Sequence, residues 1–68
     1  MTLTIAFEQE TDGRWIAEVP ELPGVLVYGE TQAQAAQLAR ALAFRVIADQ
    51  IEAGDVDALA IATVSFAA

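Results

Sequence analysis

The sequence contains neither cysteine nor histidine among its 68 residues. Without cysteine the chain can form no disulfide and offers no thiolate to a metal ion. Without histidine, zinc would have to be held by carboxylates alone, and Ser-His or Cys-His nucleophiles are excluded. We therefore expect no catalytic residue, no metal site and no cofactor.

Lysine is absent as well. The chain has three basic residues, all arginines, and ten acidic residues, so the net charge is −7. Binding of duplex or single-stranded nucleic acid requires a basic stripe, so we expect no direct nucleic-acid binding. Two interpretations of the acidity stay open. It either steers the protein towards a basic partner or keeps an apolar small protein soluble.

Long apolar runs are also lacking. No stretch approaches the roughly 18 residues of a membrane span, and the N-terminus lacks the charged-then-apolar layout of a signal peptide. We expect a cytoplasmic protein with no membrane partner.

The length allows one domain, residues 1–68, with a modest core. A chain of about 60 residues buries only about 60% of the surface that its unfolded form exposes, so small domains usually need a disulfide, a metal or self-association. With the first two excluded, we expect a homo-oligomer.

Three short strands are predicted in the first half. In Thr2–Glu10 apolar residues alternate, with Leu3, Ile5 and Phe7 on one face. A turn at Asp12 and Gly13 leads to a return strand, Arg14–Val19, in which Ile16 and Glu18 lie opposite Trp15, Ala17 and Val19. Pro20 and Pro23-Gly24 bracket a compact turn before a third strand, Val25–Tyr28, which Gly29 closes.

One long helix follows. Thr31 and Gln34 fit the capping-box spacing, so the helix should run from Gln32 to Ala53 and end at Gly54. After a loop at Asp55–Ala58, the alternation in Leu59–Phe66 predicts a last strand. The order β-β-β-α-β indicates an α+β domain: a three-stranded antiparallel meander and a final strand, with the helix on one face of the sheet.

The helix carries two apolar groups at 100° per residue. One should face the sheet: Ala35, Leu38, Ala39, Leu42 and Val46. The other, Phe44, Ile47 and Ile51 near Arg40, lies roughly opposite. A single sheet cannot bury both groups, so we predict that the second is part of a protein interface. The alternative is that the C-terminal segment or the neighbouring loops fold over it.

Other candidate sites are weaker. Glu21 and Leu22, between the prolines, form either an exposed knuckle that docks a partner or simply a rigid turn. Tyr28 has a polar end and lies just before the helix, so it is a further interface candidate, whereas Trp15 should belong to the core. The acidic residues Glu8, Glu10, Glu18, Asp49 and Glu52 form no magnesium-binding motif.

The run from Asp12 to Gly24, followed by Gly29-Glu30-Thr31 and the Ala35/Ala39/Leu42 helix, resembles the N-terminal domain of HicB-family antitoxins over about residues 2–50. The shared positions have structural roles. Asp12 and Gly13 form a turn, Pro20 and Pro23 stop strands, Gly24 and Gly29 permit unusual backbone, and Thr31 caps a helix.

The resemblance implies a partial ribonuclease-H-like fold and a protein that binds and masks a small basic mRNA-cleaving toxin, HicA, without catalysis of its own. Many members of the family continue into a DNA-binding domain. Here the sequence ends at Ala68, which makes DNA binding doubtful. The alternative function is an orphan homo-oligomeric domain that acts as a scaffold or interaction module.

Overall fold

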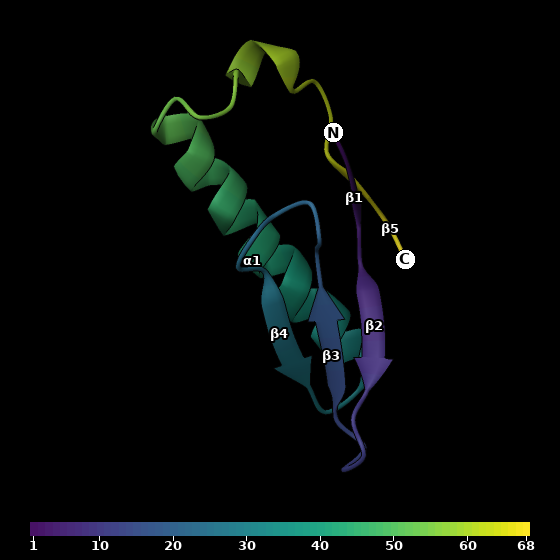
Figure 1. The fold of residues 1–68 in the computed structure, drawn as a ribbon. Helices are drawn as coiled ribbons and strands as arrows, with labels where there is room; N and C mark the ends of the chain where they lie inside the picture. Colours follow the sequence, from purple (N-terminus) through teal and green to yellow (C-terminus); the bar gives the residue numbers. More distant parts are fainter.

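The computed structural model describes all 68 residues. Two short strands, β1 (Thr2–Thr4) and β2 (Ala6–Gln9), precede β3 (Trp15–Glu18) and β4 (Leu26–Gly29). The helix α1 (Gln32–Glu52), a 3₁₀ turn at Ala58–Ala60 and β5 (Ser65–Ala67) complete the chain (Figure 1). The predicted α+β class and the β-β-β-α-β order are confirmed.

The strands form two small sheets. β2, β3 and β4 form the antiparallel meander, in which Ala17 lies between Phe7 and Val27. β5 pairs with β1 in parallel, with Leu3 opposite Phe66. Ile5 divides the predicted first strand into β1 and β2, and its amide donates to the carbonyl of Ala67 at 2.7 Å. β1 and β2 thus hold different partners along one extended segment.

The turns use the residues that the sequence pointed to. Gly13 and Gly24 have φ angles of +92° and +91°, which residues with a Cβ rarely adopt. Between the two prolines, the amide of Leu22 donates to the carbonyl of Val19 at 3.0 Å, and the amide of Val25 donates to the carbonyl of Leu22 at 3.1 Å. The segment is therefore a tight turn held by its own backbone.

The helix begins at Gln32 as predicted and ends at Glu52, one residue before the predicted end at Ala53. The Thr31 hydroxyl accepts a hydrogen bond from the amide of Gln34 at 3.0 Å, and the Gln34 side chain accepts one from the amide of Glu30 at 2.6 Å. At the other end Ala53 is the C-cap and Gly54 has a φ of +78°. No helix has the length and apolar character needed to cross a bilayer.

The core lies between α1 and one face of the sheet, with Ala35, Ala39 and Ala43 completely buried at the contact. Small side chains let the helix approach the strands closely. At Gly29 the backbone of the helix comes so near that a Cβ there would lie 2.5 Å from the Ala35 amide nitrogen. The remaining core residues come from the strands, the turn and the last helical turns: Leu3, Ile5, Ala17, Val19, Leu22, Val25 and Ile47.

Two predictions about the helix faces are wrong. Ile47 is only 4% exposed and belongs to the core, whereas Leu38 is 42% exposed. The reason is that α1 crosses the sheet obliquely (Figure 1), so the buried row follows every fourth residue, Ala35, Ala39, Ala43 and Ile47. Such a row drifts around the helix by about 40° per step, since four residues at 100° exceed one full turn.

The last strand and Gly29 need smaller corrections. The strand begins at Ser65 rather than Leu59, because Asp57 accepts a hydrogen bond from the amide of Leu59 and caps the short 3₁₀ turn. Leu59 is left 96% exposed. Gly29 is needed for space and not for an unusual backbone, since its φ is not positive.

Candidate partner-binding surface

The face of the meander that points away from α1 is uncovered. Side chains alternate across a strand, so the residues that do not pack on the helix share this second face. Two cross-strand rows are fixed by the register: Ala6, Glu18 and Leu26, and next to them Glu8, Ile16 and Tyr28. We refer to these six residues as the bare face.

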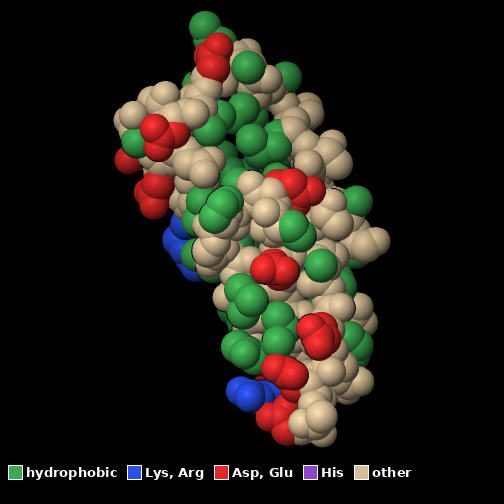
Figure 2. Space-filling view, viewed as in Figure 1, with side chains coloured by type: hydrophobic (Ala, Val, Ile, Leu, Met, Phe, Trp, Pro, Cys, Tyr) green, Lys and Arg blue, Asp and Glu red, His purple; other side chains and the backbone are tan.

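The bare face combines apolar and acidic side chains. Leu26 and Tyr28 are each 47% exposed, and Ile16 is half-buried between them and β2. Glu8 and Glu18 are exposed. Figure 2 looks onto this side and shows hydrophobic and acidic side chains intermixed over the strands. Neighbouring exposed apolar residues on so small a protein are typical of interaction surfaces.

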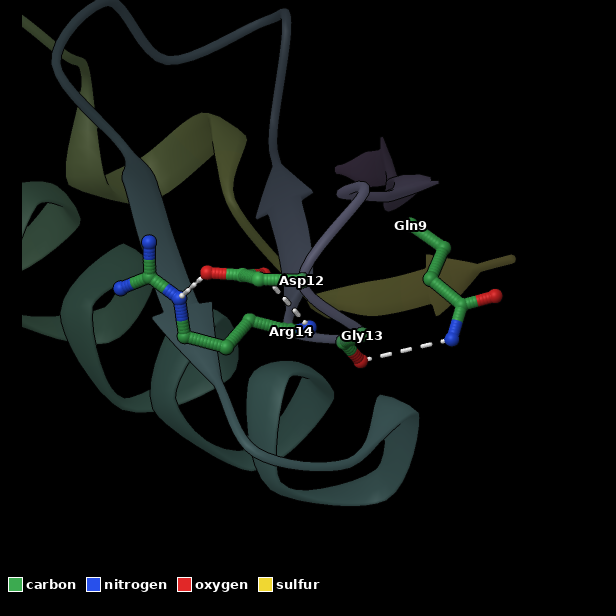
Figure 3. A network of polar contacts seen from close by, with 4 residues as sticks. All are labelled: Gln9, Asp12, Gly13 and Arg14. Carbon is green, nitrogen blue, oxygen red and sulfur yellow. Dashed lines mark hydrogen bonds and ion pairs between the residues drawn. The ribbon is translucent and has the colours of Figure 1, made fainter.

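Arg14 borders one end of the bare face. Its guanidinium lies over the Tyr28 ring, 5.0 Å from the centroid, while its Nε donates to Asp12 at 2.8 Å (Figure 3). The Arg14 amide also donates to Asp12 at 3.0 Å. These bonds, the backbone one first, lower the pKa of Asp12. The one basic group at this face is therefore neutralised by its neighbour, and the surface stays acidic.

The prediction of an exposed knuckle at Glu21 and Leu22 is wrong for Leu22. Leu22 is 4% exposed and packs in the core. Glu21 lies on the surface, but its carboxylate accepts hydrogen bonds from the Thr4 amide at 3.1 Å and the Thr4 hydroxyl at 2.8 Å. These two bonds tie the proline turn to the end of β1. The rigid-turn interpretation fits these contacts.

The same hydrogen bonds lower the pKa of the Glu21 carboxyl, chiefly through the Thr4 amide. A carboxyl whose pKa is lower in the folded state stabilises the fold above its unfolded value and loses this contribution as the pH falls through the folded value. We therefore expect Glu21→Gln to lower the stability at pH 7 and to have a smaller effect below the usual carboxyl pKa of about 4.3. Urea unfolding between pH 3 and pH 7 measures the difference.

Thr4→Val provides the matched control. It removes the hydroxyl donor and keeps the amide donor. At pH 7 it should therefore lower the free energy of unfolding by less than Glu21→Gln does. The double variant should cost less than the two single losses added together, because both act on one contact. Equal pH profiles for wild type and Glu21→Gln would contradict this assignment.

The predicted interface residues of the helix lie in different environments. Phe44 is 51% exposed and its ring contacts Phe66 of β5 edge-to-face at 5.6 Å. Arg40 lies over the same Phe66 ring at 5.5 Å. Ile51 is 37% exposed, and Ile47 is buried. The C-terminal strand thus covers one side of Phe44, as the alternative interpretation expected, and leaves the rest of this ring and Ile51 in solvent.

The sequence interpretation missed Leu26 and Ile16 as surface residues. The signal was present, because Leu26 and Tyr28 alternate with Val27 just as Ile16 and Glu18 alternate with Ala17. Trp15 packs partly buried against the core, as predicted. No three acidic side chains are grouped so that they could hold a metal ion, and the surface has no pocket.

Comparison of the chain with protein-family models, with curated proteins and with solved structures gives no match.

Proposed function

We propose that the protein is a HicB-like antitoxin-type binding protein that masks a small basic mRNA-cleaving partner and performs no catalysis itself. The observation that carries the proposal is the bare face: the exposed apolar side chains of Leu26 and Tyr28 lie on the edge strand β4, and the carboxylates of Glu18 and Glu8 lie on the two strands beside it. A partner of opposite charge gains both apolar burial and electrostatic attraction there.

The charge of the whole chain agrees with such a partner. At −7, the protein attracts a basic protein from a distance and repels nucleic acid. A second copy of the chain is a poor occupant of the bare face, because face-to-face stacking would place Glu8 and Glu18 near their own equivalents. Since an mRNA-cleaving partner acts where messenger RNA is, the proposal places the protein in the cytoplasm.

A small basic protein encoded by a neighbouring gene would supply the partner for the test, and a gene neighbourhood without one would count against the proposal. We expect the chain to inhibit RNA cleavage by that protein at equimolar concentration, and Leu26→Glu to weaken binding by about tenfold or more, since a buried unpaired carboxylate replaces an apolar contact. Binding should also weaken as salt rises. Leu59→Glu, at a leucine 96% exposed away from the sheet, is the matched control.

Two results would overturn the proposal: unimpaired RNA cleavage with excess chain present, or equal binding by the Leu26→Glu and Leu59→Glu variants. Recovery of the chain alone from a co-expression would favour the orphan scaffold instead.

A further inference from the structure

Strand β4 has a neighbour on one side only, because the order of the meander is β2-β3-β4. The Val19 amide donates to the Val25 carbonyl at 3.0 Å. Bonded pairs alternate along an antiparallel ladder, so the backbone groups of Leu26 and Tyr28 point away from β3. The Leu26 amide donates to the Gly24 carbonyl at 3.2 Å, and the Tyr28 amide is left unpaired. We call this outer side of Leu26–Gly29 the open edge.

The open edge lacks the features by which natural sheets keep their edge strands from pairing. Such strands usually carry charged side chains, proline or a bulge. The sequence of β4 is Leu26-Val27-Tyr28-Gly29, which contains no charge and no proline. The other outer strand of the meander, β2, contains Glu8 and is soon followed by Glu10. Of the two outer strands, β4 is therefore the one that can accept a further strand.

The helix adds a second apolar row beside the open edge. Arg40 lies over Phe66 of β5, and Figure 1 shows β5 and β4 on opposite sides of the meander. Leu38 and Leu42 are each about 200° from Arg40 around the helix axis, so they lie on the β4 side of α1. Leu38 is 42% exposed and Leu42 is half-buried. A strand added to β4 would therefore meet apolar side chains on both of its faces.

We infer that the open edge joins two copies of this chain, with their β4 strands antiparallel and Val27 of each opposite Val27 of the other. In this register the Tyr28 amide of each copy donates to the Leu26 carbonyl of the other, so the unpaired amide gains a partner. The two meanders become one sheet of six strands. On the bare face, Leu26 of one copy lies beside Tyr28 of the other, which joins the two apolar pairs.

The position of α1 is compatible with this pairing. The helix contacts both β3 and β4, so its axis lies about half a strand spacing inside β4. The two-fold axis lies half a strand spacing outside β4. With strands about 4.8 Å apart, the two α1 axes are about 10 Å apart, which is the separation of packed helices. Leu38 of each copy then lies towards the gap between them.

The charge distribution permits a second copy at the open edge, although each chain carries −7. The nearest acid on the bare face is Glu18, beside Leu26 on β3. In the dimer the two Glu18 residues are three strand spacings apart, or about 14 Å, which exceeds the screening length of about 8 Å at physiological ionic strength. The dimer leaves both bare faces open to solvent and does not depend on the proposed function.

The first test compares the same charge change at two exposed leucines. Light scattering after size exclusion should give wild type a mass of twice 7.2 kDa at high protein concentration, falling on dilution. Leu38→Glu should weaken self-association by about tenfold or more, because it places carboxylates between the helices. Leu59→Glu, at a leucine 96% exposed and far from the open edge, should change it by less than about twofold. A wild type that is monomeric at all concentrations, or equal effects of the two variants, would overturn the inference.

Hydrogen exchange followed by NMR tests the pairing without a substitution. The Tyr28 amide should exchange rapidly in dilute protein and at least about tenfold more slowly where the dimer predominates. The Val27 amide points towards β3, so it should be protected already in the dilute protein. A dimer in which the Tyr28 amide still exchanges rapidly would contradict pairing through β4.

The register is tested by a single cysteine, for which the cysteine-free sequence is a clean background. Residues in a non-bonded cross-strand pair have Cα atoms about 4.5 Å apart, which is within the range of a disulfide. Under mild oxidation Val27→Cys should therefore give a covalent dimer, and Leu59→Cys should stay monomeric. Circular dichroism checks that Val27→Cys folds. A folded and dimeric Val27→Cys protein that does not cross-link would contradict the register.

Discussion

Ile47→Ala should lower the free energy of unfolding by about 2–5 kcal/mol, which is the usual cost of truncating a buried isoleucine. Ile47 is 4% exposed, and it ends the buried row of the helix under the sheet. For a domain of this size the total stability is of the order of 3–10 kcal/mol, so the substitution should remove a large part of the free energy of unfolding. Denaturant unfolding followed by circular dichroism measures the loss.

Leu38→Ala is the control on the same helix. Leu38 is 42% exposed, and alanine has the better helix propensity, so the loss should stay below about 1 kcal/mol. The helical periodicity alone assigns Leu38 to the core and Ile47 to the surface. If Leu38→Ala lowered the free energy of unfolding more than Ile47→Ala, the result would support the assignment from periodicity and contradict the structure.

Gly29→Ala should lower the free energy of unfolding by about 2–3 kcal/mol, in the upper range of overpacking effects. The added Cβ would lie 2.5 Å from the Ala35 amide nitrogen and 2.8 Å from its Cα. Both are backbone atoms in the first turn of a capped helix, so no side chain can turn aside. Relief requires the helix to move away from β4, which would loosen the contacts of Ala39 and Ala43. Thermal unfolding measures the effect.

Gly54→Ala separates this steric effect from glycine's backbone freedom. Gly54 has a φ of +78° and open space around it, so alanine there should cost about 1 kcal/mol from backbone strain alone. In the double variant Gly29→Ala with Ala35→Gly, only part of the stability should return, because the amide nitrogen and Cα of residue 35 remain in place. Equal losses at the two glycines would refute the steric explanation.

Local signals in the sequence were enough for the hairpin, the helix and its start, but not for the division of the first strand at Ile5 or for the start of the last strand at Ser65. Thr31 and Gln34 marked the start of the helix, Gly54 its end, and Asp12 with Gly13 the hairpin, because each acts through bonds to residues only a few positions away. The antiparallel meander followed from the alternation of Leu3, Ile5 and Phe7 and of Trp15, Ala17 and Val19.

Relations between distant elements were not available from these signals. The crossing angle of α1 on the sheet decides whether Ile47 or Leu38 is buried. A helical wheel shows only the positions of residues around the helix axis, so it cannot predict that angle. The contact of Glu21 with Thr4 joins residues 17 positions apart. No local sequence pattern predicts a hydrogen bond over that separation. The bare face needed the register of β3 and β4, which places Leu26 beside Glu18.

The pairing of β1 with β5 has a consequence for the order of folding. The amine of Met1 donates to the carbonyl of Thr63, 62 residues along the chain, so closing this sheet orders a loop that includes nearly the whole protein. Contacts of such long sequence separation incur the largest loss of chain entropy, and in residues 53–68 only partly buried side chains, among them Val64 and Phe66, pack against the core to offset it. We therefore expect the meander and α1, which rest on contacts of shorter range, to assemble first. We expect β5 to dock last and to be the first element released on heating.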